Sequence, residues 1–219
     1  TTGNQNVVIG TQALHTATDV SNVVAIGLYA GLDIDSSVAD GTVLIGRSAG
    51  ENIQNGARNT AVGYQAMLDS VGAGDNSVLG YEALKEGTTS EQNVAIGTYA
   101  LGSNSASALT GNENVAVGFK ALNVAEGSSA SNIAIGAHSA KLAQNVSNIV
   151  SIGRNALGNL TTSTNADGSV AIGRSSLREL TTGSGNTAVG YQTLIATTTQ
   201  SNSTAIGYNA GGASAGNSN

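Results

Sequence analysis

One short segment recurs along the whole chain and constrains its fold more than any other feature of the sequence. Its clearest copies, NTAVGYQAM at 59–67 and NTAVGYQTL at 186–194, differ at two positions. Aligned on their central glycine, the copies have twelve anchors: Gly10, Gly27, Gly46, Gly63, Gly80, Gly97, Gly118, Gly136, Gly153, Gly173, Gly190 and Gly207. Seven of the eleven spacings between anchors are 17 residues, and the others are 18 to 21. We therefore expect one repeat array of twelve coils over residues 1–211 and a flexible polar tail at 212–219.

The residues before each anchor favour a short β-strand that ends at the glycine. The position directly before the glycine is Ile in eight copies, Val in three and Leu in one, while the position three before it is mostly Val. The position between them, two before the glycine, is usually Ala. This alternation predicts a strand buried on both faces, with the large β-branched side chains in an apolar ladder and little space opposite. Ile96, for example, is expected to be buried, so that a charge there would unfold several coils.

A repeat of this length has room for two or three short strands and their turns. The sequence therefore predicts an all-β fold, a parallel β-solenoid (β-roll or β-helix) of about twelve 17-residue coils. Stacked at about 4.8 Å, such coils would span roughly 55–60 Å. An Asn stands four residues before the glycine in seven copies, where we expect it to bond the backbone of the local turn. A helical repeat is disfavoured because Gly lies within the motif and β-branched residues dominate it.

The absence of Pro and the scarcity of aromatic residues agree with this interpretation. A chain without Pro can use every backbone donor in a hydrogen-bonded ladder. Aromatic residues are only 3% of the chain, as expected for a core too thin to hold large rings. Charged residues are 10%, so Asn, Ser, Thr and Gly must form much of the surface.

The N-[TSV]-[AV]-[IVL]-G-Y-x-A-L units resemble repeats of phage tail fibres and related bacterial surface proteins. They are also similar to the S-V-A-I-G repeats in the heads of trimeric autotransporter adhesins, which form left-handed parallel β-rolls. The resemblance covers residues 4–211. It implies a left-handed homotrimer that lies outside the cell or on the virion surface and serves as a shaft or in host attachment. The repeat unit of this chain is longer than that of the adhesin heads, so the shape of the coil is expected to differ.

The sequence itself also favours self-association. The Ala column two before each glycine and the small residues three after it would make a smooth, uncharged stripe, which three copies could bury about an axis. In the alternative, both columns line the thin core of a monomer. An end-to-end polymer, an extracellular filament, is a further possibility, because the open ends of a solenoid are strand edges that invite pairing.

Aromatic and arginine side chains share one place in the repeat, the first or second position after the anchor. These ladder residues are Tyr29, Arg47, Tyr64, Tyr81, Tyr99, Phe119, Arg154, Arg174, Tyr191 and Tyr208. In a functional interpretation they bind a host-surface polysaccharide, since sugar rings stack on aromatic faces and Arg bonds hydroxyls or carboxylates. In a structural interpretation they pack at a subunit interface.

Two segments between anchors are candidate recognition loops, because insertions in repeat arrays map to loops. The longest interval contains GSNSASALTGN at 102–112. Another carries Asp33, Asp35 and Asp40, which could hold calcium, although the pattern lacks the glycine and terminal Glu of a helix–loop–helix site. A solvated acidic loop is the favoured interpretation.

Composition and motifs argue against several other functions. A net charge of −6 disfavours a nucleic-acid partner, the lack of Cys removes thiolate metal sites, and no apolar run is long enough to span a membrane. His15 and His138 are the only imidazoles, and no nucleophile, phosphate-loop or zinc motif occurs. We therefore expect no enzymatic activity, no catalytic residues, no metal and no cofactor. Thr pairs such as Thr161–Thr162 suggest ice binding, but they do not recur in every coil.

Overall fold

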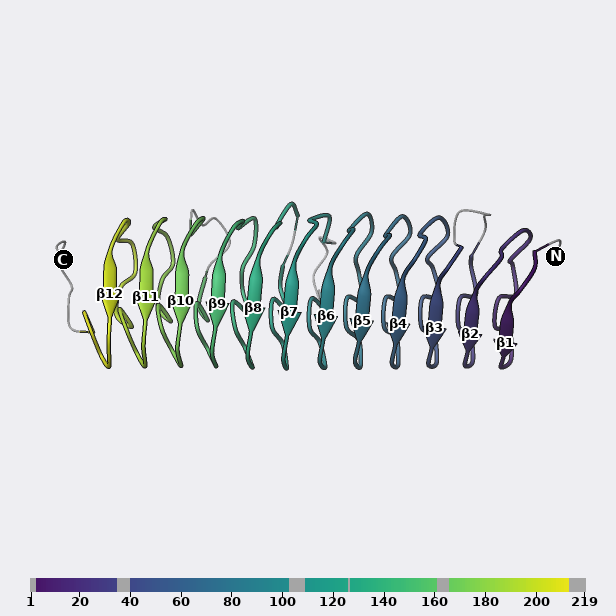
Figure 1. The fold of residues 1–219 in the computed structure, drawn as a ribbon, viewed down its shortest axis with the longest axis horizontal. Coiled ribbons are helices and arrows are strands. Elements are labelled where there is room, and N and C mark those ends of the chain that lie inside the picture. Colours follow the sequence, from purple (N-terminus) through teal and green to yellow (C-terminus); the bar gives the residue numbers. More distant parts are fainter. Residues whose placement is uncertain (1–2, 35–39, 103–108, 126, 161–165, 213–219) are drawn as a thin grey trace.

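The computed structural model describes residues 3–34, 40–102, 109–125, 127–160 and 166–212, and places them in one continuous stack of coils (Figure 1). Each coil contributes one three-residue strand, and we number the coils by their strands. The strands are β1 (Val7–Ile9), β2 (Val24–Ile26), β3 (Val43–Ile45), β4 (Thr60–Val62), β5 (Ser77–Leu79), β6 (Val94–Ile96), β7 (Val115–Val117), β8 (Ile133–Ile135), β9 (Val150–Ile152), β10 (Val170–Ile172), β11 (Thr187–Val189) and β12 (Thr204–Ile206). The described residues contain no helix. The predicted all-β parallel solenoid is thus confirmed.

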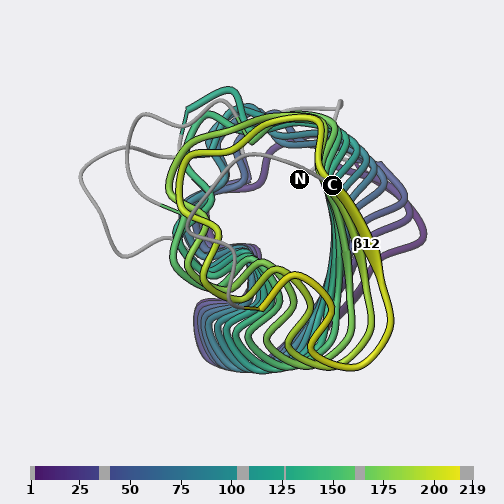
Figure 2. The same ribbon diagram turned by 90° about the vertical axis from the view of Figure 1, so that its left-hand side faces the viewer.

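The twelve strands form one parallel sheet in chain order. Its register follows the aligned repeat, since Ala95 pairs with Ala116 and Ile96 with Val117. Eleven connections join the strands, and Figure 2 shows the coils one behind another with the strand on one side. Backbone hydrogen bonds also join coils outside the sheet, as from Gln65 N to Arg47 O at 3.0 Å. The coils are therefore held together around their circumference as well as through the strands.

The two faces of the sheet are the reverse of the prediction. The middle residue of the strand points into the coil, and Ala95 and Ala116 are completely buried. The β-branched residues on either side of it face outward, and Ile96 is 39% exposed. The prediction that Ile96 lies in a buried ladder is wrong, because Ala95 takes the inward position of β6 and buried Leu101 fills the space beside it.

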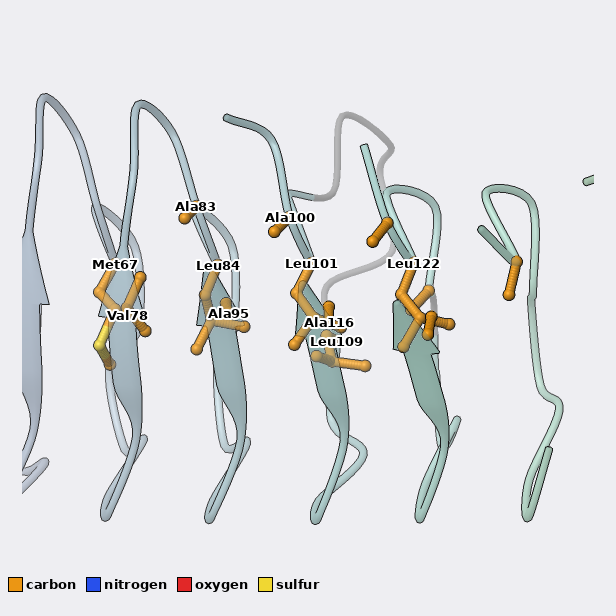
Figure 3. Packing of buried hydrophobic residues seen from close by; sticks show 14 of the residues in the cluster. Met67, Val78, Ala83, Leu84, Ala95, Ala100, Leu101, Leu109, Ala116 and Leu122 are labelled. Carbon is orange, nitrogen blue, oxygen red and sulfur yellow. The ribbon is translucent and has the colours of Figure 1, made fainter. Parts of the chain in front are cut away.

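The inward strand residues pack against the wall that follows the glycine. Leu84, Leu101 and Leu122, each four residues after an anchor, are buried beside these Ala residues, and Figure 3 shows side chains of this core in the coils from Met67 to Leu122. Ala100, three residues after its anchor, is buried as well. Both small-residue columns therefore line the core, and the prediction that they form a stripe for other copies is wrong.

The anchor glycines form a seam of close backbone contacts. Their φ angles are +123° to +148°, a region that L side chains rarely adopt. A Cβ on Gly63 would lie 2.3 Å from the carbonyl oxygen of Gly80. Three further positions of the coil are left-handed without being glycine in most copies, as Arg58 (φ 57°), Gln65 (φ 52°) and Met67 (φ 54°) show. These left-handed residues let one short coil close.

The Asn residues four before the anchor form a buried ladder along the stack. They are Asn59, Asn76, Asn93, Asn114 and Asn132. The Oδ1 of Asn59 accepts both the backbone N–H of Asn76 at 3.0 Å and its Nδ2 at 3.1 Å. Asn76 Nδ2 also donates to the carbonyl oxygen of Ser90 at 2.9 Å. The prediction of local turn bonding is largely wrong, because most of these bonds join different coils; Asn93 does also bond Glu91 O nearby.

The described part of the chain ends soon after the last strand. Short strands recur along the predicted array, from β1, which begins at Val7, to β12, which ends at Ile206. Of the predicted tail at 212–219, all but Gly212 lies outside the described residues.

Candidate functional site

The outward residues of the strands form a long apolar strip, here called the outer face. It consists of the first and last residues of β1–β12, twenty-four positions in all. Twenty are Val, Ile or Leu, four are Thr or Ser, and none is charged. Twelve strands spaced by about 4.8 Å make this strip roughly 55 Å long. Such a continuous apolar surface is unusual on a soluble monomer and is typical of a contact site.

Next to the outer face, after the anchor glycines, five rings form a continuous aromatic column over coils 4–8. The column consists of Tyr64, Tyr81, Tyr99, Phe119 and His138. Tyr64 and Tyr81 are stacked, with centroids 5.0 Å apart and planes at 10°. The three contacts that follow are edge-to-face, with centroids at 5.5, 6.5 and 5.2 Å. Stacked rings cover each other's faces, whereas edge-to-face rings leave more of their faces open.

Cationic side chains lie over several of the rings. Arg47 lies 5.7 Å from the centroid of Tyr64, and Lys120 lies 5.3 Å from that of Phe119. A second stack, Tyr191 on Tyr208 at 5.2 Å, is flanked by Arg174 at 5.8 Å from the Tyr191 ring. The structure thus brings eight of the ten predicted ladder residues into ring contacts.

The two remaining ladder residues, Tyr29 and Arg154, make no ring contact with any described residue.

One tyrosine of the aromatic column has a shifted pKa. Hydrogen bonding to the Glu82 carboxylate, with desolvation as a smaller contribution, raises the pKa of Tyr81 to about 12. The Tyr81 hydroxyl therefore stays neutral at physiological pH.

A pocket of about 460 Å³ lies where the aromatic column ends, across coils 8–10. Its charged and polar lining includes His138, Lys141, Arg154, Asn159, Arg178 and Glu179. We call it the cationic pocket. Sequence reasoning named His138 and Arg154 but missed the others. The sequence signal for it is limited to the charge distribution, since residues 120–219 hold five basic and three acidic side chains, against three and eleven in residues 1–119.

The single carboxylate of this pocket is already engaged. Glu179 pairs with Arg178 at 2.6 Å and accepts a hydrogen bond from Asn159 Nδ2 at 2.7 Å. These contacts, that with Asn159 first, lower the pKa of Glu179. Lys141 and Arg154 have no ion-pair partner within the described part of the chain. Two positive charges of the pocket are therefore uncompensated.

His138 joins the aromatic column to the cationic pocket. Its ring meets Phe119 edge-to-face, with centroids 5.2 Å apart. Desolvation, followed by the charges of Lys141, Lys120 and Arg154, lowers the pKa of His138. The imidazole is therefore neutral at pH 7 and adds to the aromatic surface rather than to the positive charge.

The other candidates from the sequence remain without a site. Over the described ranges, no three His, Cys, Asp or Glu side chains gather in a way that could hold a metal ion. Asp35, most of the loop at 102–112 and Thr161–Thr162 lie outside those ranges. His15 is exposed and far along the chain from His138. No helix among the described residues is long and apolar enough to cross a bilayer.

Comparison of the chain with protein-family models, with curated proteins and with solved structures found no match of any of these three kinds. The outer face, the aromatic column and the cationic pocket are therefore the features from which a function can be argued.

Proposed function

We propose that the chain is a rigid, non-enzymatic segment of an extracellular or virion-surface fibre, a shaft of the tail-fibre or adhesin type. In this proposal three copies associate in parallel through their outer faces. The observation that carries the proposal is the outer face itself, an uncharged strip mostly of Val, Ile and Leu along the whole stack.

The shape of the outer face suits a side-by-side assembly. It runs without a break along the stack, because the strands pair in chain order from β1 to β12 (Figure 1). An interface about 15 Å wide and roughly 55 Å long would bury about 800 Å² on each copy, which is the size of a standard stable interface. A closed ring of three copies would remove the apolar strip from water without leaving an open surface for further growth.

The fold also supports the role of a shaft. Each coil is bonded to the next through the sheet, through the turns and through the buried Asn ladder. The glycine seam leaves little freedom between coils, because the backbones of successive anchors are in contact. A stack with these properties transmits force along its length and keeps surface groups at a fixed spacing.

The assembly can be tested by the mass of the native particle. We expect sedimentation equilibrium to give three times the chain mass of 21.5 kDa for the wild-type protein. The pair of changes Ile96→Asp and Ile135→Asp should give a monomer with unchanged circular dichroism. Val71→Asp is the matched control, because Val71 is 36% exposed but lies outside the outer face. A wild-type monomer at micromolar concentration would overturn the proposal, and indefinite filaments in negative stain would replace it with the end-to-end polymer.

We further propose that the fibre binds host-surface polysaccharide through the aromatic column. The supporting observation is that Tyr81 and Phe119 stay more than two-fifths exposed although they pack on other rings. Binding of a polysaccharide panel should weaken at least tenfold in the Tyr64→Ala, Tyr81→Ala variant. Unchanged binding would assign these two rings to the subunit interface or to the stability of the stack.

A further inference from the structure

We propose that the cationic pocket binds a carboxylate-bearing sugar, with the acid group between Lys141 and Arg154 and the sugar ring against His138 and Phe119. This inference deepens the polysaccharide-binding part of the proposed function and rests on it. It names the class of saccharide and moves its main contacts to coils 8–10.

Positive charge prevails only in the later part of the chain, where this pocket lies. The first 119 residues have a net charge of −8, whereas residues 120–219 have a net charge of +2. An acidic ligand is therefore repelled by most of the stack and is attracted to its later coils. Within those coils, Lys141 and Arg154 remain free to pair with a ligand, because Glu179 is held by Arg178 and Asn159.

The chemistry of the lining fits a sugar acid. The Arg154 guanidinium can bond a carboxylate through two parallel N–H groups, and the Lys141 ammonium adds a point charge. The neutral ring of His138 lines the pocket and packs on Phe119 beside it. Aromatic surfaces of this kind contact the apolar C–H face of a sugar.

The size and sign of the site argue against a nucleic acid. A duplex carries one negative charge per about 1.7 Å of its axis and requires a basic surface that follows it. Here the neighbouring coils 1–6 are acidic, and the pocket of about 460 Å³ has the size of a small ligand. A saccharide with at most one carboxylate on each sugar unit places much less negative charge against the rest of the stack than a duplex does.

The proposal can be tested with two sugars that differ only in the acid group. By ligand-observed NMR titration of the full chain, glucuronic acid should bind at least tenfold more tightly than glucose. The Lys141→Gln, Arg154→Gln variant should lose this preference, with unchanged circular dichroism. Arg58→Gln is the matched control, since Arg58 is an exposed basic residue that lies outside both the ladder and the pocket, and it should bind as the wild type does.

Three results would overturn the proposal: no preference for glucuronic acid, a preference that survives in the double variant, or inorganic phosphate binding as tightly as glucuronic acid, which would indicate an anion site without sugar recognition. These results are separable from a failure of the wider function. Loss of the pocket alone leaves the particle mass and the binding of neutral polysaccharides unchanged, whereas a failure of the fibre proposal appears in the particle mass.

Discussion

Ala95 and Ile96 are neighbours in β6, yet the smaller side chain is completely buried and the larger is 39% exposed. A ranking by hydrophobicity would place them the other way round. The difference shows that the radius of the coil, and not the apolarity of the residue, selects what lies inside. Most inward positions carry Ala because Leu101 and its equivalents fill the space from the opposite wall. In β3 the inward residue is Leu44, and there Gly50 stands where other coils have that leucine. Outward positions are free to carry the β-branched residues that strands favour.

The polar residues of the same coils show the same contrast. Asn59 and Asn76 join coils 4 and 5 inside the core, where both side chains are buried. Arg58 and Asp75, one residue earlier in each coil, join the same two coils on the exposed surface through two bonds of 2.6 and 2.7 Å. A buried polar group must find its hydrogen-bond partner within the fold, whereas an exposed polar group can bond water instead.

The largest expected effect is that of a charge on the inner face. Ala95→Asp places a carboxylate in a space with no partner and no room, and should lower the free energy of unfolding by about 5 kcal/mol or more. Urea denaturation followed by circular dichroism measures the loss, and hydrogen exchange should show coils 5–7 opening first. Stability equal to that of the wild type would mean that the inner face is assigned wrongly.

An interruption of the buried ladder should have the next largest effect. Asn93→Ala leaves the backbone N–H of Asn114 and the carbonyl of Gly111 without a side-chain partner, at a cost of about 2–4 kcal/mol. The adjacent exposed change Gln92→Asn serves as the control in the same urea titration. If both variants were equally stable, the amide ladder would not contribute to the cohesion of the stack.

A charge on the outer face should have a much smaller effect on the single chain. Ile96→Asp should change the free energy of unfolding of the isolated chain by less than about 1 kcal/mol, since the side chain already meets water. The measurement is a urea titration at a concentration where the wild type is monomeric. Local unfolding of several coils in this variant would mean that Ile96 lies on the inner face, as the sequence predicted.

The smallest effect belongs to the exposed ion pair. The bond from Arg58 lowers the pKa of Asp75 below 3.8. Because the folded pKa is the lower one, any stabilisation is present above the pKa of the unfolded chain and is lost as the pH falls through the folded value. In carboxyl NMR, Arg58→Gln should return the midpoint of Asp75 toward 3.8, while the thermal midpoint at pH 7 stays unresolved from that of the wild type. A large thermal shift would place this pair among the structural contacts.

The sequence was sufficient to predict the fold but not to predict which strand residues point into the coil. Anchor spacing predicted the parallel solenoid, the strand positions and the register, because one copy must stack on the next. It did not assign the faces, since an alternation of Ala and Ile is the same whichever side is inward. The deciding geometry includes left-handed turns at residues such as Gln65 and Met67, whose side chains give no signal for a positive φ.

The candidate sites divide in the same way. Four of the five rings of the aromatic column were predicted because they stand at the first or second position after an anchor, and neighbouring rings are in contact. The cationic pocket was missed because Lys141 and Arg178 occupy the fifth position after their anchors while Arg154 occupies the first. Only the three-dimensional coil brings these two positions to one opening.

The in-order sheet also determines how a fibre made of such chains would fail under tension. Each coil is attached only to its two neighbours, so an axial load acts on all the junctions in series, and the weakest one gives way first. Coils 2 and 3 carry Val23 and Thr42, and coils 9 and 10 carry Ile149 and Ser169, where coils 4–8 carry the amide ladder. We expect an optical trap to record the first extensions at these two junctions, and Ile149→Asn to raise the force needed at the second. The rupture strength of the shaft would then be set by its least cohesive pair of coils, whatever the number of coils in the stack.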